Sequence, residues 1–369
     1  MMNFDELLKP AEPANDVAII EMIKKSNLPV ILYGASVDVA DQITKKLSDN
    51  GIAIQMVVYD EESPVMTGVT RLLKDVETVP VQDIDRKLSA YHVIPGFVKA
   101  YSRLASVSAK FKHARSVTYL SEIFDMEMIT PVFILENEDY LRSFYNRLMD
   151  QSSKEAFVAY LLSKTRQDMQ YLPPVFEKNQ YFPQGIFTLT DHESYFDCGA
   201  YTGDTIADFL KASGGSYKHI WAAEPDRTNY QQLLQFIERQ QLPNIETVNK
   251  GIYSHTGKLP FQEEGSMLSM ISEVSEHYIE VDTIDHITAG RPVTYIKMDV
   301  EGAELQALKG AEQTIRTCKP ILGISIYHKE HDIINVPAYI NKIVPDYTFY
   351  FRVHKKLAID TVLYGIIDR

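Results

Sequence analysis

One stretch in the second half of the sequence has the residue types and spacing of a nucleotide-cofactor site. It reads Asp197-Cys198-Gly199-Ala200-Tyr201-Thr202-Gly203-Asp204-Thr205, with a short apolar run before it and a helical pattern after it. Glycine lets the backbone approach a ligand closely and adopt a positive φ. An acid here suits a ligand with an ammonium group, whereas it would repel the phosphates that a helix N-terminus attracts. The pattern predicts a strand, a tight loop and a helix that bind a nucleotide cofactor.

A second acidic position follows the next predicted strand, His219–Ala223. Glu224 lies 27 positions after Asp197 and is followed by Pro225 and Asp226. In a doubly wound fold, the acid at the tip of the second strand binds ribose hydroxyls. A carboxylate can accept two hydrogen bonds from a vicinal diol, which explains the residue type.

A third group of polar residues follows the fourth predicted strand, residues 293–300. Asp299 ends that strand, Glu301 and Glu304 come directly after it, and His328 follows the next strand, residues 321–326. Because the carboxyl ends of parallel strands meet at one edge of a sheet, these side chains are expected beside the cofactor crevice. Glu301 and Glu304 also have a structural interpretation, since acids stabilise a helix N-terminus through its dipole.

The elements that position these groups form two predicted α/β domains. With 369 residues the chain is long enough for two, and Leu172-Pro173-Pro174 interrupts the helical pattern before it. We therefore predict a Rossmann-like N-terminal domain over residues 1–170 and a second domain over residues 171–369. Two closing strands, 347–353 and 361–366, have no helix between them and predict an antiparallel hairpin at the sheet edge.

The N-terminal half contains a β-α-β pattern of its own. A buried strand leads into Gly34, and an acid, Asp60, ends the next strand. A dinucleotide fingerprint needs three glycines, and only Gly34 is present, which favours a structural Rossmann-like domain. A nicotinamide-dependent oxidoreductase that uses Gly34 and Asp60 remains the alternative function.

Composition excludes several function classes. The net charge of −13 disfavours binding to nucleic acid or to an anionic membrane surface, and no apolar run is long enough to span a membrane. The two cysteines, Cys198 and Cys318, have no metal-ligand spacing and suggest a reducing, cytoplasmic environment. The N-terminus lacks the order of a signal peptide. No His or Cys cluster requires a metal, so none is predicted, although Asp299 could bind a divalent cation.

Three motifs together resemble the FkbM family of methyltransferases. They are Asp197–Thr205, Glu224-Pro225, and Ile296-Lys297-Met298-Asp299-Val300-Glu301-Gly302-Ala303-Glu304. The last is the most specific, because four polar positions surround a strand-to-helix turn. The resemblance covers roughly residues 180–366. It implies a seven-stranded Rossmann-like methyltransferase fold, S-adenosylmethionine as cofactor, O-methylation of a small polar acceptor such as a sugar, and a bacterial source.

The resemblance also assigns roles to residues. Asp197 and the loop from Gly199 to Gly203 would hold the methionine portion, and Glu224 the ribose, with Asp226 assisting. Asp299 and His328 are the candidate bases that remove the acceptor proton, and Glu301 and Glu304 orient them. The remaining predicted cofactor contacts are Ala200, Tyr201, Asp204, Thr205, Pro225, Lys250, Gly251 and Asp299, with Asp282 as a substitute on the adenine side.

Two further questions stay open at this stage. The fold could be retained in a noncatalytic nucleotide-binding protein, which would bind the cofactor without turnover. The predicted partner is a small-molecule acceptor, for which a carbohydrate is one candidate. A homo-oligomer is the other candidate assembly. The N-terminal domain is the candidate region for acceptor recognition.

Overall fold

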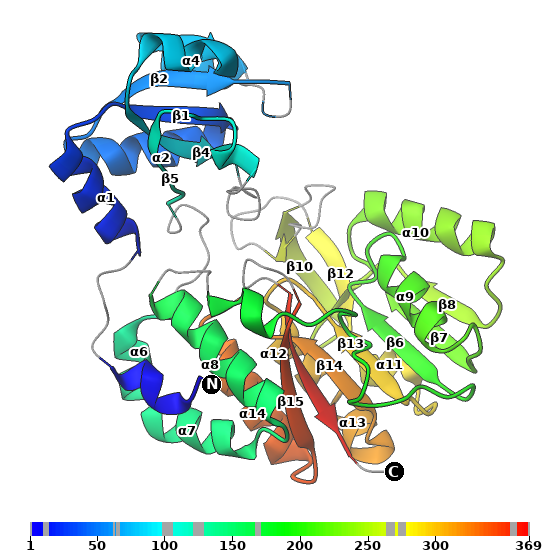
Figure 1. Cartoon of the computed structure of the whole chain (residues 1–369). Helices are drawn as coiled ribbons and strands as arrows, with labels where there is room; N and C mark the ends of the chain where they lie inside the picture. The colour runs from blue at the N-terminus through cyan, green and yellow to red at the C-terminus, as the bar shows by residue number, and fades with distance from the viewer. Residues whose placement is uncertain are drawn as a thin grey trace. The chain divides into compact units, whose positions relative to one another are not determined.

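The computed structural model divides the chain into two compact units, each described here by itself. The N-terminal unit comprises Lys9–Pro131 and Leu161–Tyr171, and the C-terminal unit comprises Met1–Leu8, Val132–Tyr160 and Leu172–Arg369. The structure describes residues 2–9, 15–61, 63, 67–97, 106–120, 129–166, 171–262, 270–271, 278–354 and 360–367. Figure 1 labels their elements.

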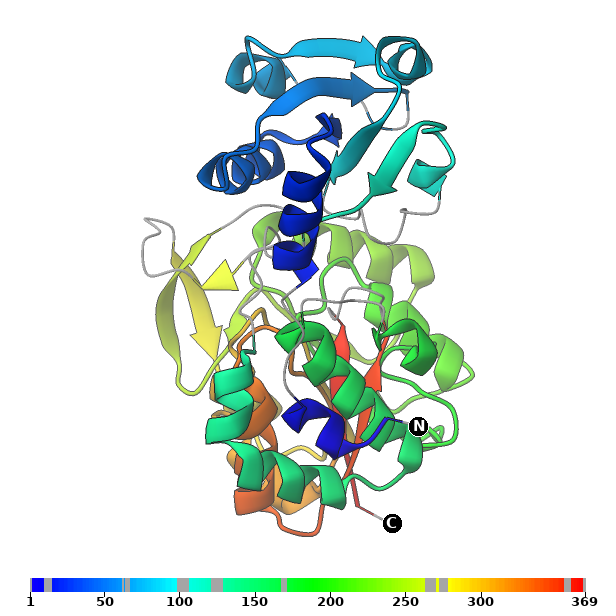
Figure 2. The ribbon, with the colours of Figure 1, turned by 60° about the vertical axis from the view of Figure 1, so that its left-hand side comes forward.

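A parallel five-stranded sheet forms the centre of the N-terminal unit (Figure 2). Its order is β3-β2-β1-β4-β5, and every neighbouring pair is parallel. The central strand β1 is buried along its whole length, as is typical of a parallel strand covered on both faces. The strands are β1 Val30–Ala35, β2 Ile54–Tyr59, β3 Glu77–Pro80, β4 Tyr91–Gly96 and β5 Ala114–Val117. The predicted Rossmann-like domain is confirmed.

Helices connect these strands, as parallel neighbours require. Apolar side chains of α1 and α2, including Ile23 and Ile43, pack with β1 residues such as Leu32 in one buried cluster. The helices are α1 Asn15–Ser26, α2 Val37–Asp49, α3 Thr67–Leu72 and α4 Val81–Lys87.

A seven-stranded sheet forms the centre of the C-terminal unit. Its order is β15-β16-β14-β13-β6-β7-β8, and only β16 pairs antiparallel, with β14 on one side and β15 on the other. The strands are β6 Ser194–Cys198, β7 His219–Ala223, β8 Ile245–Val248, β13 Tyr295–Met298, β14 Ile321–Ser325, β15 Thr348–Val353 and β16 Thr361–Ile366. The predicted antiparallel hairpin at the edge is confirmed, and with it the methyltransferase-type topology.

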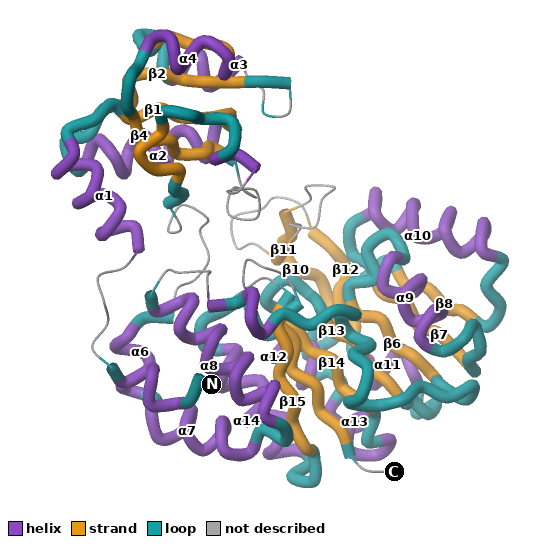
Figure 3. Tube along the Cα trace, in the orientation of Figure 1, coloured by secondary structure: helices purple, strands orange, loops and turns teal. Residues whose placement is uncertain are grey.

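Helices flank this sheet, and Figure 3 shows them in purple around the orange strands. Ile206 and Phe209 of α9 pack with Tyr195 and Ile220 of the central strands, which fixes the helix against the sheet. The helices are η1 Phe4–Leu8, α6 Pro131–Glu136, α7 Glu138–Arg147, α8 Gln151–Thr165, η4 Pro173–Val175, α9 Asp204–Ala212, α10 Arg227–Gln240, α11 Ile284–Thr288, α12 Glu304–Lys309, α13 Glu312–Cys318 and α14 Asp332–Ile343.

A small second sheet interrupts the C-terminal unit between β8 and β13. Its order is β11-β10-β12-β9, with β10 and β12 antiparallel. The strands are β9 Gly251–Ile252, β10 Gly257–Gln262, β11 Met270–Ile271 and β12 Tyr278–Asp282. Among the helices of the described residues, none has the length and apolar character needed to cross a membrane.

The observed division of the chain differs from a boundary at residue 170. Helix α7 and most of α8 lie in the C-terminal unit, where they cover the edge strand β15. Phe144 packs on Phe349 with ring centroids 5.7 Å apart, and Arg352 Nη2 lies 2.6 Å from Asp150 Oδ2. These contacts join residues about two hundred positions apart, so the local pattern around Leu172 does not reveal them.

Candidate active site

The loop between β6 and α9 turns tightly against the end of β13. Gly199 has φ +79°, and a Cβ at this position would overlap the carbonyl oxygen of Asp299. Gly203 has φ +95°, and a Cβ there would overlap the ring of Phe236. Both glycines are therefore required by close packing and by a positive φ. The expected strand, glycine loop and helix are present, with Asp204 as the first residue of α9 and Thr205 as the second.

Asp197 is the penultimate residue of β6, close to the strand end where it was expected. It is fully buried, and its Oδ1 lies 3.0 Å from the ammonium of Lys297 on β13. Lys297 Nζ also donates a hydrogen bond of 2.6 Å to the carbonyl oxygen of Gly199. Burial alone would lower the pKa of Lys297, but the Asp197 and Asp299 carboxylates raise it. Asp197 thus contacts the loop through Lys297, and its expected contact with a ligand's ammonium, direct or through water, stays a prediction.

Glu224 lies at the end of β7, directly beside β6. Its Oε2 accepts a 2.9 Å hydrogen bond from the Tyr201 N–H, and its Oε1 accepts one of 2.9 Å from the Asp226 N–H. A carboxylate has about four acceptor positions, so these two bonds leave others for a ligand. Burial raises the pKa of Glu224 to about 7. Glu224 therefore ties the glycine loop to the β7 turn and keeps acceptor capacity.

Other predicted cofactor contacts already have partners within the protein. Asp226 caps α10, since its Oδ1 accepts hydrogen bonds from the N–H groups of Thr228 and Asn229 at 2.8 and 2.9 Å. Lys250 Nζ lies 2.9 Å from Asp282 Oδ2. The carbonyl oxygen of Ala223 accepts the N–H groups of both Gly199 and Ala200, and Gly251 lies in β9. These residues shape the crevice by holding its backbone, and Asn249 adds a bond of 3.0 Å to the carbonyl oxygen of Pro225.

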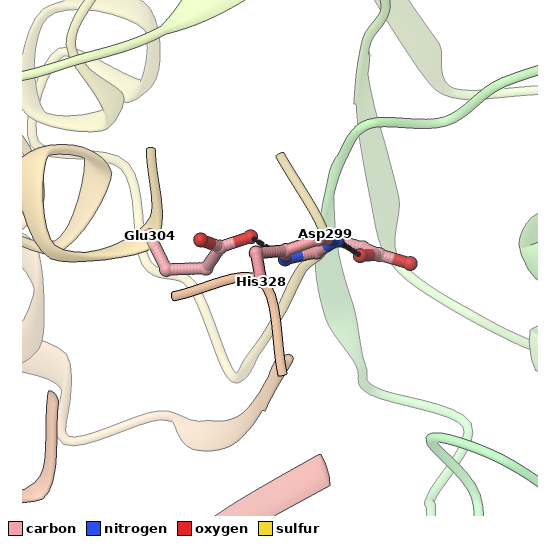
Figure 4. Close-up of side chains that lie close together, drawn as sticks. All are labelled: Asp299, Glu304 and His328. Carbon is pink, nitrogen blue, oxygen red and sulfur yellow. Dashed lines mark ion pairs between the residues drawn. The ribbon is translucent and has the colours of Figure 1, made fainter. Parts of the chain in front are cut away.

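A cluster of polar side chains lies at the adjoining ends of β13 and β14. Asp299 Oδ1 lies 3.5 Å from His328 Nε2, and Glu301 Oε2 lies 3.2 Å from the same nitrogen. Glu304 Oε1 lies 2.9 Å from His328 Nδ1, so the imidazole stands between acids (Figure 4). The structure thus brings together the three predicted catalytic residues, Asp299, His328 and Glu301.

The charges in this cluster stabilise one another. Burial would lower the pKa of His328, but Glu304, Glu301 and Asp299 together raise it well above its usual range. Burial would raise the pKa of Asp299, but His328 and Lys297 outweigh that effect and lower it. The resting cluster therefore pairs an imidazolium with carboxylates, and His328 must lose that proton before it can accept another.

Sequence reasoning missed two tyrosines that hold Asp299. Tyr181 OH donates a hydrogen bond of 2.8 Å to Asp299 Oδ2, and Tyr327 OH lies 3.4 Å from Oδ1. Tyr181 also pairs with Ser325 Oγ at 3.0 Å. Tyr327 precedes His328 directly in the sequence, and this adjacency could have indicated that Tyr327 lies beside the catalytic cluster. Tyr181 is more than a hundred residues from Asp299, so no local pattern connects them.

Among the described residues of the N-terminal unit, the turn at Gly34 leaves no open loop for a dinucleotide. A Cβ at Gly34 would lie 2.7 Å from Ser63 Cβ, so this turn is already filled by a neighbouring side chain. Asp60 Oδ2 accepts hydrogen bonds from Lys110 Nζ at 2.6 Å and from Tyr33 OH at 2.8 Å. The acid expected to bind ribose is occupied, which disfavours the oxidoreductase alternative.

The sheet order and the acids at its central strand ends define a Rossmann-like methyltransferase domain. Residues 197–349 match the model of a family described as the methyltransferase FkbM domain. This match to the family model confirms the resemblance stated from the sequence.

Solved structures similar to this chain include methyltransferase FkbM from Methylobacillus flagellatus. It is 22% identical, with a TM-score of 0.73, over 98% of this chain and 96% of that chain. At this identity the likeness concerns the fold. An rRNA methylase from Streptococcus thermophilus (16% identity, TM-score 0.32) covers 49% of this chain and 90% of its own. A putative methyltransferase from Streptococcus mutans in complex with SAH (10% identity, TM-score 0.31) aligns with 48% of this chain and 92% of its own. A search of curated proteins finds no match.

Proposed function

We propose that the protein transfers a methyl group from S-adenosylmethionine to a hydroxyl oxygen of a small polar acceptor, with a sugar or saccharide as the expected class. The observation that carries this proposal is the position of Glu224. Its buried carboxylate stands beside the glycine loop and keeps acceptor positions for a ribose diol. The adjacent strand ends carry the Asp299 and His328 cluster, to which an acceptor's proton can pass.

The residues at these strand ends fit the cofactor. Gly199 has no side chain to block the approach of a ligand to the loop, and Glu224 would bind the two ribose hydroxyls. When bound, S-adenosylmethionine supplies a methyl group that is already activated on a sulfonium centre. The protein is left with alignment of the acceptor and removal of its proton.

The remaining residues perform those two tasks. Lys297 fixes the loop through the carbonyl oxygen of Gly199. Tyr181 and Tyr327 hold the carboxylate of Asp299 at the rim. Asp299 and His328 are the proposed proton acceptors, and Glu301 and Glu304 orient the imidazole. The positions of these groups on the rigid ends of β13 and β14 favour a fixed acceptor geometry.

Isothermal titration with S-adenosylmethionine tests cofactor binding directly. We expect saturable binding to the full chain and at least a tenfold loss of affinity in Glu224→Ala, because the diol loses a charged acceptor worth about 1.5–3 kcal/mol. Glu246→Gln is a matched control, since Glu246 lies on β8 and pairs with Arg291. No binding at millimolar cofactor, or equal affinity in Glu224→Ala, would refute the proposal.

Turnover is tested by the release of S-adenosylhomocysteine from a panel of hydroxyl-bearing acceptors. His328→Ala is expected to lower turnover by about 100-fold or more while cofactor affinity stays intact, because general acid–base groups contribute factors of this size. Turnover equal to the parent would remove His328 from the mechanism. Cofactor binding without turnover on every acceptor would favour a noncatalytic nucleotide-binding protein.

A further inference from the structure

The cluster around His328 combines nitrogen and oxygen donors from two neighbouring strand ends. One ligand atom each from Asp299, Glu304 and His328 lie within 4.8 Å of one another. Figure 4 shows Glu304 and Asp299 approaching the imidazole of His328 from different sides. One imidazole and two carboxylates form a donor set for a divalent ion, provided that the side chains turn one ligand atom each toward a common point.

Two of these donors are buried without a hydrogen-bond partner. The side chain of His328 is 10% exposed, and neither ring nitrogen makes a hydrogen bond among the described residues. Glu304 Oε1 is only 2.9 Å from Nδ1, which is hydrogen-bond distance, but the angle between the two groups is not that of a hydrogen bond. Glu304 is fully buried, and its Oε2 also makes no hydrogen bond with the described residues. Buried polar atoms are almost always satisfied, so these atoms point to a ligand.

The backbone holds Glu304 in place for such a role. Its Oε1 accepts hydrogen bonds from the N–H groups of Val300 and Gly302 at 3.0 and 3.4 Å. Glu301 has φ +51° and Gly302 has φ +89°, which turns the chain so that Glu304 reaches back toward β13. The carboxylate is therefore anchored through Oε1, the same oxygen that lies 2.9 Å from His328 Nδ1.

The charge of the cluster also favours a cation. The carboxylates of Asp299, Glu301 and Glu304 all approach one imidazole. The nearby ammonium of Lys297 is shared with Asp197. Buried carboxylates are stable only when they are paired or bind metals. A divalent ion would supply the missing positive charge.

We propose that Asp299, Glu304 and His328 bind a first-row divalent cation such as Mn²⁺. Two of the three donors are carboxylate oxygens, which suit Mn²⁺, and the single imidazole adds a nitrogen donor of the kind that first-row metals bind. The sequence predicted no metal and offered only Asp299 as a residue that could bind a divalent cation; the structure adds Glu304 and His328. The tertiary structure brings Glu304, the first residue of α12, to His328 in the loop after β14, whereas they are 24 positions apart in the chain.

The role of the cation rests on the proposed methyl transfer. The site lies at the strand ends that carry the crevice, since Asp299 contacts the glycine loop through its backbone. A bound divalent ion polarises a hydroxyl oxygen that coordinates it and eases loss of its proton. With the cation bound, Asp299 and His328 serve as its ligands and no longer accept the proton. The proton would pass instead to Glu301, whose Oε2 lies 3.2 Å from His328 Nε2. The cation thereby positions the acceptor and assists its deprotonation.

The test titrates Mn²⁺ into the full chain after treatment with a chelator and its removal, without cofactor or acceptor. Free Mn²⁺ is followed by electron paramagnetic resonance. We expect one saturable site per chain and at least a tenfold weaker affinity in Glu304→Gln and His328→Ala, because each removes a ligand. Glu246→Gln is the matched control. Its carboxylate lies 3.4 Å from His219 Nε2, so it removes the same charge from another His–Glu pair.

Three outcomes would overturn the site: no saturable binding in the parent, unchanged affinity in Glu304→Gln, or equal losses in Glu246→Gln. Glu304→Gln keeps an oxygen that can accept the two backbone N–H groups. If it still fails to fold, as judged by circular dichroism, the partly exposed Asp299→Asn replaces it with the same expected loss.

Cofactor titration of the same chelated protein separates this inference from the proposed function. Binding of S-adenosylmethionine without any Mn²⁺ site would remove the cation and leave the methyltransferase proposal standing. A Mn²⁺ site in a protein that does not bind S-adenosylmethionine would retain the cation site and overturn its role in methyl transfer.

Discussion

At the scale of single residues, the crevice is organised by carboxylates that differ in their surroundings. Asp197 is neutralised by a buried lysine, whereas Glu224 contacts backbone N–H groups. Asp299 is held by tyrosines and lies beside an imidazole. The same functional group therefore serves as a structural anchor, as a candidate ribose ligand and as part of the candidate catalytic cluster.

The pH dependence of cofactor binding should report Glu224. Its pKa is raised to about 7 by burial, so the carboxylate is mostly protonated below that pH and ionised above it. The ionised form is the stronger acceptor for a diol and attracts a sulfonium cation. Affinity for S-adenosylmethionine should therefore rise as the pH increases through about 7. Titration calorimetry between about pH 6 and pH 8 measures this trend.

Glu224→Gln provides the comparison for that profile. An amide does not titrate in this range, so the variant should bind more weakly and with a flatter pH dependence. A profile in Glu224→Gln as steep as in the parent would assign the titration to another group.

The ion pair of Lys297 and Asp197 should be strongly coupled. Lys297→Met leaves an unpaired buried carboxylate, and such a break costs about 3–5 kcal/mol. The double variant Lys297→Met with Asp197→Asn should recover much of that loss, because no charge is left unpaired. Urea unfolding of the parent, both single variants and the double variant gives the coupling free energy. Additive losses would show that the two groups stabilise the protein independently.

At the scale of elements, the parallel strands β6, β7 and β13 place the loop, Glu224 and Asp299 at one edge of the sheet. Asp197 pairs in register with Lys297 on one side and with Ala222 on the other. This register makes the ion pair possible and brings the loop against the end of β13. The geometry of the loop therefore depends on strand pairing as well as on its own glycines.

Gly199→Ala tests this close approach. The added Cβ would overlap the carbonyl oxygen of Asp299, so the loop or the end of β13 must move. We expect at least a tenfold loss of affinity for S-adenosylmethionine, measured by titration calorimetry.

Gly215→Ala is its matched control. Gly215 has the same φ of +79°, but a Cβ there would meet open space. Both variants should lose about 1–3 kcal/mol of stability from the backbone strain. Only Gly199→Ala should lose cofactor affinity, and equal affinities would mean that the overlap has no bearing on the site.

At the scale of the whole molecule, each unit has its own parallel sheet, and the chain passes between the units more than once. Residues 132–160 complete the C-terminal unit, where Phe157 packs on Phe351 with ring centroids 5.4 Å apart. Acceptor recognition by the N-terminal unit remains a proposal.

Two fragments test this organisation. Residues 132–369 should unfold cooperatively and bind S-adenosylmethionine, whereas residues 171–369 should be unstable, because β15 loses the helices that cover its apolar side chains. Circular dichroism and calorimetry compare them. Equal unfolding midpoints would show that α7 and α8 are dispensable. If the N-terminal unit recognises the acceptor, residues 132–369 should bind cofactor and lose turnover.

The sequence by itself determined the fold class, the edge hairpin and the strand ends that carry Asp197, Glu224 and Asp299. Local patterns suffice for these features, because strands, tight glycine loops and helix starts are encoded by neighbouring residues. It also supplied the motif that resembles the FkbM family.

Only the tertiary structure decided the partners of these groups. A buried lysine takes the charge of Asp197, Tyr181 reaches Asp299, and Glu304 meets His328. Helix α7 covers β15 for the same reason that these pairs escaped prediction: each contact joins segments that are distant in the sequence and are brought together by strand order and packing. The chemistry of a carboxylate depends on its surroundings, which the chain supplies only after it has folded.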